Sequence, residues 1–166
     1  MALKTDVRGM HWVYPDYFEV GREQARAFAR AIKCDDPACF DEKAAAELGY
    51  HALVVPLTFV SIFAKIIQDD FFRNVDVGLE TMQIVQVDQQ FVYNKPLFVG
   101  DKLFGRMDIE SVNERFGADI VVTKNTCSNE NGEVLLFAYT TLMGHEGDDS
   151  IQLKWDKESG QVVRTA

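Results

Sequence analysis

The chain has 166 residues, a formal net charge of −9 and a hydrophobic content of 47 %. These values are typical of a globular domain with a hydrophobic core, and the length favours a single domain over residues 1–166. Nucleic acids and anionic membranes attract basic surfaces, so the acidic balance argues against both as partners. The 12 phenylalanines argue against a disordered chain, because disordered segments carry few aromatic residues.

The cysteines and the opening residues predict where the protein is located. Three cysteines are present, and none belongs to a CxxC pair: Cys34, Cys39 and Cys127. Residues 1–10 lack the basic-then-apolar pattern of an export signal. Both features favour a reducing cytoplasm. The most apolar stretch, residues 52–67, is shorter than the roughly 20 residues that a bilayer requires, which favours a buried helix over a membrane span.

The beginning of the chain is predicted to contain one strand and two helices. Residues 12–20 are rich in aromatic and branched side chains, but Pro15 restricts such a segment to the edge of a sheet. Apolar residues recur at helical spacing over residues 22–33. Asp41 is the predicted N-cap of a second, short helix over residues 42–48.

A longer helix and a run of strands follow. Pro56 suits the first turn of a helix over residues 57–72, whose apolar residues cover most of its circumference. Such a helix must be covered by other elements. Four later segments are rich in branched and aromatic residues and are separated by short turns, which predicts antiparallel strands: 81–93, 102–115, 118–128 and 133–144. An antiparallel sheet curled around one apolar helix is the hot-dog form of the α+β class.

The end of the chain, residues 146–166, is predicted to be a polar tail. Within it, residues 152–155 and 161–163 have the composition of short strands. We expect them to contribute at most one more short strand.

Several kinds of chemistry are excluded by the missing motifs. The histidines lie far apart and have no metal-binding spacing, so no metal site is predicted: His11, His51 and His145. The sequence has no glycine-rich phosphate loop and no GxSxG motif, and we expect no cofactor. Acid–base chemistry by Asp35, Asp36 or Asp41 together with His51 remains open, although charged residues in a loop are usually only solvated.

Several segments resemble the MaoC-type family of (R)-specific hydratases and dehydratases. They are Cys34-Asp-Asp-Pro-Ala-Cys39, Val55-Pro56-Leu57-Thr58-Phe59, Phe91-Val-Tyr-Asn-Lys-Pro96 and Gly100-Asp101-Lys102-Leu103. Over its whole length the chain is similar to the C-type subunits of mycobacterial (3R)-hydroxyacyl-ACP dehydratases. The resemblance implies the hot-dog fold, a place in type II fatty-acid elongation toward mycolic acids, and a long-chain 3-hydroxyacyl-ACP as substrate.

The chain departs from this family at the catalytic loop. Hydratases of the family carry a D-x-N-P-[IVL]-H loop, in which the Asp and the His handle the proton and the water. Aligned on Pro37, the present chain has Cys34 at the Asp position and Cys39 at the His position. A pair of thiols does not replace a carboxylate and an imidazole in acid–base catalysis. We therefore expect a chain without catalytic residues, which forms a heterodimer with a catalytic MaoC-type subunit that supplies both groups.

The predicted substrate-binding residues lie on the long helix and on the strand that follows it. On the helix, a partly polar stripe interrupts the apolar surface, and Lys65 pairs with Asp69 one turn later. On the strand over residues 81–93, the alternation slips near Val85, which predicts a bulge. We predict that these residues contact the acyl chain: Thr58, Phe59, Ser61, Ile62, Lys65, Gln86 and Gln89. The alternatives are that the helix simply reaches solvent there and that the glutamines form the exposed face of an edge strand.

A basic ridge follows the first helix, with cations at Arg22, Arg26, Arg30 and Lys33. Such a ridge would attract an acidic carrier protein, or it would be a solvated, salt-bridged face. Two other functions stay open for the whole chain. One is a stand-alone acyl-thioester-binding module, and the other is a hot-dog thioesterase with Asp41 or Asp88 as its base.

Overall fold

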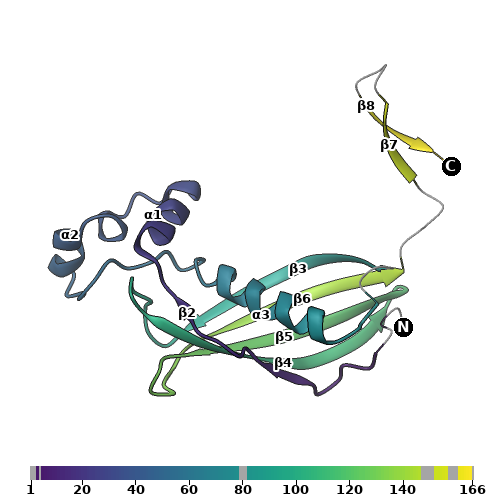
Figure 1. Ribbon diagram of the computed structural model, residues 1–166, viewed down its shortest axis with the longest axis horizontal. Helices are drawn as coiled ribbons and strands as arrows, with labels where there is room; N and C mark the ends of the chain where they lie inside the picture. The colour runs from purple at the N-terminus through teal and green to yellow at the C-terminus, as the bar shows by residue number, and fades with distance from the viewer. Residues whose placement is uncertain (1–2, 4, 79–81, 147–151, 157–160, 166) are drawn as a thin grey trace.

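A curved antiparallel sheet dominates the fold (Figure 1). The computed structural model describes residues 3, 5–78, 82–146, 152–156 and 161–165. The strands run in the order β1-β4-β5-β6-β3, with β2 also paired to β4. Their bounds are β1 (His11–Val13), β2 (Phe18–Glu19), β3 (Met82–Tyr93), β4 (Lys102–Arg115), β5 (Ala118–Ser128) and β6 (Val134–Glu146). The four predicted long strands are confirmed, apart from Thr81, which lies outside the described residues. The predicted α+β hot-dog class is confirmed as well.

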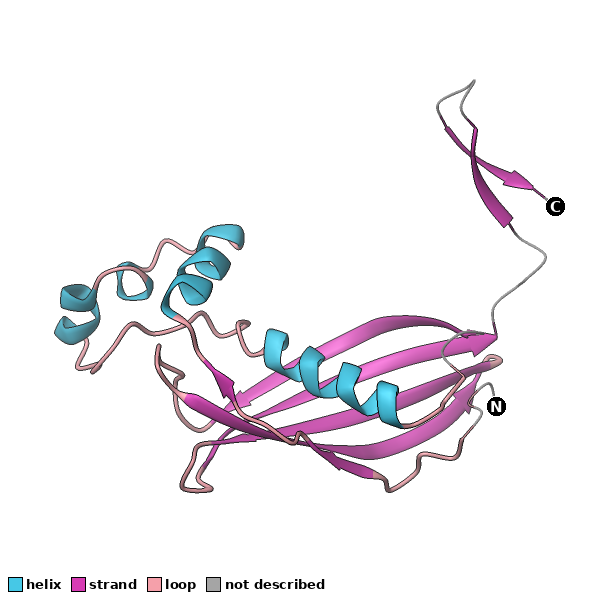
Figure 2. Ribbon diagram, in the orientation of Figure 1, coloured by secondary structure: helices cyan, strands magenta, loops and turns pink. Residues whose placement is uncertain are grey.

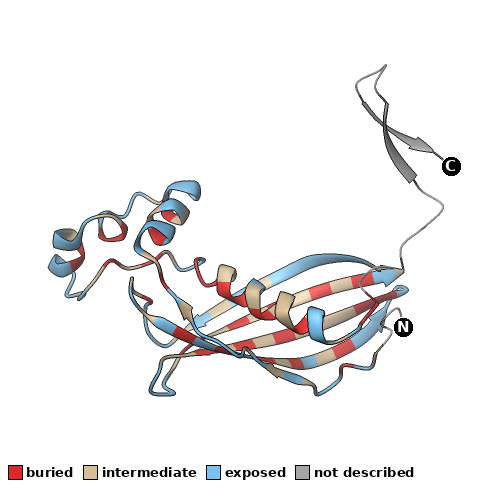
Figure 3. Ribbon diagram, viewed as in Figure 1, coloured by how far each residue is buried: buried red, intermediate tan, exposed pale blue. Residues whose placement is uncertain are grey.

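Helix α3 (Ser61–Asn74) lies across one face of this sheet (Figure 2). Its buried side chains, Phe63, Ala64, Ile67 and Phe71, face the strands. Buried and exposed residues alternate along β4, as expected for a strand with one covered face (Figure 3). Gly105 on β4 allows the helix to approach closely, because a Cβ atom there would lie only 2.3 Å from Ile67 Cδ1.

The beginning and the covering of the long helix differ from the prediction. The helix starts at Ser61 rather than at residue 57. Before it, Phe59 N donates to Pro56 O at 2.9 Å and Ser61 N donates to Thr58 O at 3.1 Å, so tight turns precede the α-helix. The sheet covers only one face of the helix, and Ile62 and Ile66 pack against the core but remain partly exposed.

The remaining helices form a group at one end of the sheet (Figure 1). They are α1 (Arg22–Ala31), the 3₁₀-helix η1 (Pro37–Cys39) and α2 (Glu42–Glu47). The predicted N-cap is confirmed, because the carboxylate of Asp41 accepts a hydrogen bond from Ala44 N at 2.9 Å. The predicted edge strand over residues 12–20 is divided into β1 and β2, with Pro15 between them.

Two short strands lie near the end of the chain. Strand β7 (Gln152–Asp156) and strand β8 (Gln161–Thr165) pair with each other in a separate two-stranded sheet. Residues 152–155 and 161–163 therefore belong to two strands rather than to the one short strand expected, and these strands do not extend the main sheet. The rest of the predicted polar tail lies partly outside the described residues. Among the described helices, none has the length and apolar character needed to cross a membrane.

Candidate functional site

A cleft of about 750 Å³ separates helix α3 from the β3 and β6 edge of the sheet. The helix side and the turn before it contribute Thr58, Ser61, Ala64, Lys65 and Gln68. The sheet side contributes Ile84, Gln86, Gln89, Phe91, Thr140 and Leu142. The cleft is amphipathic, because polar and apolar side chains both line it.

Five of the seven predicted substrate-binding residues lie together in this cleft: Thr58, Ser61, Lys65, Gln86 and Gln89. Phe59 and Ile62 do not line it. Phe59 is fully buried in the core, where its ring packs against Phe18 and Phe28 with centroid distances of 6.2 and 5.4 Å. Ile62 packs against the edge of the same core. Both follow a cleft residue in the sequence, and neighbouring residues of a turn or helix point in different directions.

The polar side chains on the sheet side form one hydrogen-bonded group. Gln89 is at its centre: its Nε2 donates to Tyr139 O at 2.7 Å, and its Oε1 accepts from Thr140 Oγ1 at 3.1 Å. Gln86 Nε2 donates to the same Oε1 at 3.2 Å. Thr140 was not predicted, because nothing in the sequence distinguishes it from its neighbour Thr141 on the same strand. These hydrogen bonds lower the cost of covering the group with a ligand.

The helix side of the cleft ends in an ion pair. Lys65 Nζ lies 2.7 Å from Asp69 Oδ2, which confirms the pairing predicted from their spacing. The Lys65 side chain is 70 % exposed and also lines the cleft, so it marks the outer rim. On the opposite wall, the register of β3 against β6 shifts between Gln86 and Asp88. The bulge predicted near Val85 is therefore confirmed.

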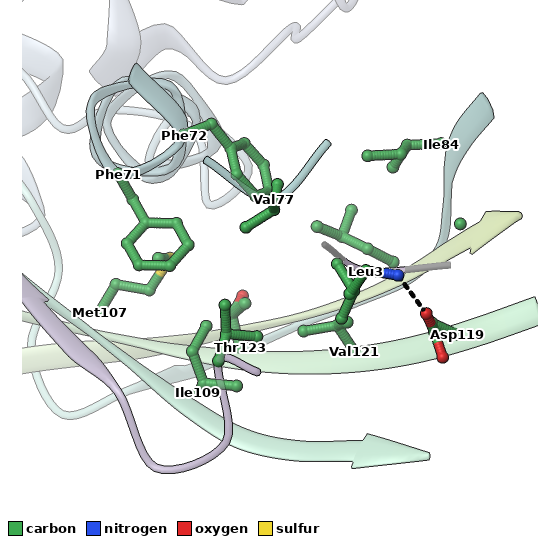
Figure 4. Close-up of a pocket in the computed structure, with 13 residues that line it drawn as sticks. Leu3, Phe71, Phe72, Val77, Ile84, Met107, Ile109, Asp119, Val121 and Thr123 are labelled. Atoms are coloured by element: carbon green, nitrogen blue, oxygen red, sulfur yellow. Dashed lines mark hydrogen bonds between the residues drawn. The ribbon is translucent and has the colours of Figure 1, made fainter. Parts of the chain in front are cut away.

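An apolar pocket adjoins the cleft at the far end of the sheet (Figure 4). Ile84 and Leu142 line both spaces. The pocket has a volume of about 30 Å³ and is walled mainly by apolar side chains, among them Phe71, Phe72, Met107, Ile109 and Val121. Leu3 closes it, and its backbone N donates to the buried Asp119 Oδ2 at 2.8 Å.

The loop that resembles the catalytic loop of hydratases contains two thiols. Cys34 Sγ and Cys39 Sγ are 3.9 Å apart, and both cysteines are free. Burial, and the contact with Cys34, raise the pKa of Cys39 to about 12, so its thiol stays protonated at neutral pH. The side chain of Asp36 stabilises the loop, because its Oδ1 accepts a hydrogen bond from Ala38 N at 2.9 Å. The ring of His51 lies against that of Phe98 in a tilted arrangement, with a centroid distance of 4.4 Å.

Arg22 and Arg26 of the basic ridge form ion pairs and hydrogen bonds with neighbouring residues of the helical group. Arg22 forms an ion pair with Glu42, and Arg26 donates to Glu23 at 3.1 Å and to Phe40 O at 2.6 Å. Arg30 lies 5.9 Å from the ring of Phe40. These contacts favour a salt-bridged face over a free basic surface. In the part of the chain that the structure describes, no three His, Cys, Asp or Glu side chains gather as metal ligands would.

Strand β3 forms an open edge of the sheet beside the cleft. Among the described strands, it pairs only with β6. Its apolar side chains are unusually exposed for a strand: 51 % for both Val85 and Val87 and 41 % for Val92. A long, apolar, unpaired edge is a surface on which another strand can pair.

Comparison with known proteins places the chain in a family. Residues 7–137 match the family described as "FAS1-like, dehydratase domain region". The chain is 74 % identical to a UPF0336 protein of Mycobacterium leprae, over 100 % of both sequences. It is also 69 % identical to a chain of the C-terminally truncated HadBC (3R)-hydroxyacyl-ACP dehydratase complex from Mycobacterium tuberculosis, with a TM-score of 0.81, covering 85 % of this chain and 99 % of that one.

A second solved structure is a longer protein. It is a MaoC-like dehydratase with 27 % identity and a TM-score of 0.79, and the match covers 97 % of the present chain but 52 % of that protein. The family match, the sequence identities and the structural similarity agree. The chain belongs to the FAS1-like dehydratase family, and its fold is the MaoC-like hot-dog fold.

Proposed function

We propose that this chain is the non-catalytic, acyl-chain-binding subunit of a heterodimeric (3R)-hydroxyacyl-ACP dehydratase that acts in type II fatty-acid elongation toward mycolic acids. A MaoC-type partner subunit supplies the catalytic Asp and His. One observation carries the proposal: the cleft is intact, while the loop that would hold the acid–base pair holds Cys34 and Cys39 instead.

The chemistry of dehydration supports this division of work. A proton must leave the carbon beside the thioester, and the departing hydroxyl must receive one. Positioned groups with pKa values near neutrality do this best. The thiol of Cys39, whose pKa burial raises to about 12, is far from that range. The proton transfers therefore belong to the partner.

The cleft suits the acyl chain of the substrate. Transfer of each methylene from water to an apolar site is worth about 0.8 kcal/mol, so a long chain gains much by burial. Gln89 and the Thr140 hydroxyl already have hydrogen-bond partners, which lowers the cost of covering them with methylenes.

The open edge of β3 supports a partner subunit beside the cleft. Exposed apolar residues such as Val85 and Val87 gain most when a second strand or sheet covers them. The relative from Mycobacterium tuberculosis belongs to a complex. The MaoC-like dehydratase is about twice as long as the segment it shares with this chain, which leaves room for a second unit in one polypeptide.

The two alternative functions have less support. Asp41, one candidate base for a thioesterase, already caps helix α2. Asp88, the other, lies on the exposed stretch of β3. A stand-alone acyl-thioester-binding module would use the same cleft, and only the presence or absence of a partner separates it from the proposed subunit.

Co-expression tests the proposal. The chain is produced alone and together with a MaoC-type subunit that has an intact Asp/His loop, and size-exclusion chromatography is followed by hydration assays on crotonyl and long-chain enoyl thioesters. We expect a stable complex, activity in the complex, and none in the isolated chain. As a control, replacing the partner's Asp and His should abolish activity without causing the two subunits to dissociate. Turnover by the isolated chain that is lost in Asp36→Asn or His51→Ala would overturn the proposal.

A further inference from the structure

Two thiols meet in the turn between α1 and α2, away from the cleft. Cys34 Sγ and Cys39 Sγ are 3.9 Å apart. Cys34 is half-buried, whereas Cys39 is only 3 % exposed. A disulfide needs a sulfur–sulfur distance of roughly 2.05 Å, so the sulfurs must approach by about 1.9 Å.

The backbone holds both cysteines in place. Cys34 N donates to Ala29 O at 2.9 Å, which ties it to the end of α1. Cys39 N donates to Asp36 O at 3.1 Å, and the carboxylate of Asp36 accepts from Ala38 N at 2.9 Å. The contact between the thiols is therefore a property of the folded turn, and the turn need not open for them to react.

We propose that Cys34 and Cys39 are a reversible oxidation site, which hydroperoxides convert to an intramolecular disulfide. Two thiols and one hydrogen peroxide give one disulfide and two waters. The two electrons that leave the sulfurs reduce the O–O bond of the peroxide. A dithiol reductant reverses the step by thiol–disulfide exchange.

Exposure sets the order of the two steps. Peroxide reaches the half-exposed Cys34 first, and the Cys34 thiolate attacks one peroxide oxygen. The O–O bond breaks, Cys34 becomes a sulfenic acid, and the hydroxide that leaves takes up a proton to form water. The sulfur of Cys39 then attacks the sulfur of Cys34. The S–O bond breaks, and the departing hydroxide leaves as water with the proton of the Cys39 thiol.

Burial of Cys39 has two consequences for this reaction. Its raised pKa keeps it protonated and slow toward peroxide in solution, which protects it from direct oxidation. Its position against Cys34 makes the second step intramolecular, so the sulfenic acid is captured before it meets other thiols. The third cysteine, Cys127, is 3 % exposed on β5 and serves as an internal reference.

Mass spectrometry of the full chain tests the site. The reduced protein is treated with hydrogen peroxide and then catalase, unfolded, and alkylated with N-ethylmaleimide. We expect one alkylated thiol in place of three. The tryptic peptide Cys34–Lys43 should be unalkylated and lighter by two hydrogens, while Cys127 is alkylated. Dithiothreitol before alkylation should restore all three thiols.

Single variants separate the site from general oxidation. Cys39→Ser should form no intramolecular disulfide, and its Cys34 sulfenic acid should be trapped by dimedone. Cys127→Ser should still lose two thiols. Three alkylated thiols in the oxidised wild type, equal thiol loss in Cys39→Ser, or a disulfide that includes Cys127 would each overturn the proposal.

Phenylarsine oxide gives an independent readout. It condenses with two neighbouring thiols and releases one water, and it requires no oxidant. We expect one arsenical per native chain in the wild type and in Cys127→Ser, and none in Cys34→Ser or Cys39→Ser. Arsenical binding that survives either of these last two substitutions would contradict the pairing, and circular dichroism shows whether each variant is folded.

Discussion

Gln89 on β3 and Thr140 on β6 lie directly opposite each other, and the Thr140 hydroxyl donates to the Gln89 side-chain oxygen at 3.1 Å. Gln89 also donates to the backbone oxygen of Tyr139 at 2.7 Å. This side chain therefore joins the two strands that form the sheet wall of the cleft. The wall is polar, and its Gln89 and Thr140 side chains are hydrogen-bonded to each other.

Removal of Gln89 should weaken this wall. In Gln89→Ala, the buried hydroxyl of Thr140 loses its acceptor, and an unpaired group of this kind costs about 1–3 kcal/mol. We expect a loss of this size in the free energy of unfolding, measured in urea. The neighbouring Gln90→Ala, at an exposed position on the same strand, is the matched control and should change stability by about 0.5 kcal/mol or less. Equal losses in both variants would contradict the assigned network.

Positive charges introduced on β3 should weaken the affinity of the chain for the partner subunit. Val85 and Val87 are each 51 % exposed on the open edge, so Val85→Lys with Val87→Lys should leave the fold intact. Burying these ammonium groups against a second subunit is costly, and we expect the affinity for the partner to fall at least about tenfold, or 1.4 kcal/mol. The control is Val13→Lys, because Val13 is 58 % exposed and lies on the other edge strand, β1. Analytical ultracentrifugation of the complex measures the effect, and unchanged affinity would place the interface elsewhere.

Gly105 should be intolerant of a side chain. A Cβ at this position would lie 2.3 Å from Ile67 Cδ1 and 2.9 Å from Phe63 Cζ, so Gly105→Ala forces α3 away from β4. We expect a loss of stability of about 1–3 kcal/mol. Ile67→Val removes the closest of these atoms and costs about 0.5–1.5 kcal/mol alone. The double variant should be more stable than the sum of the single losses predicts; strict additivity in thermal unfolding would show that the two sites do not touch.

The buried thiols should make the protein less stable in alkali. Burial raises the pKa of Cys127 and of Cys39 to about 12, whereas an unfolded cysteine has a pKa of about 8.5. The native state therefore holds these protons more tightly, and its stability, full below about pH 8, falls as the pH rises toward 12. Urea unfolding between neutral pH and pH 10.5 measures the slope. Cys127→Ala should reduce it, and an identical slope in that variant would contradict this cause.

The strands were predictable because their signals are local. Alternating branched residues and short turns define β4 and β5, whose bounds match the prediction. The start of α3 was not predictable in the same way. Pro56 and the apolar residues after it are compatible with a helix, but Val55 N donates to Leu97 O, and this contact with a distant segment directs the chain into turns before Ser61.

The cleft was predictable only where its residues are near one another in sequence. Helical spacing connects Ser61 to Lys65, and Gln86 and Gln89 lie only three residues apart on β3. Thr140 and Leu142 are some fifty positions from β3, and only the pairing of β3 with β6 brings them to Gln89 and Gln86. The apolar pocket behind them also depends on long-range contacts, since Leu3 closes it.

The chain-length dependence of a blocked cleft tests the central claim most directly. In the complex with a catalytic partner, Ser61→Trp should obstruct the cleft, with the thermal midpoint measured alongside to exclude general overpacking. Short substrates do not reach Ser61, so their kcat/KM should be nearly unchanged. Long substrates lose the burial of distal methylenes, about 0.8 kcal/mol each, and their kcat/KM should fall progressively with length. A uniform loss at all lengths, or no loss in a folded complex, would show that the acyl chain does not occupy this cleft.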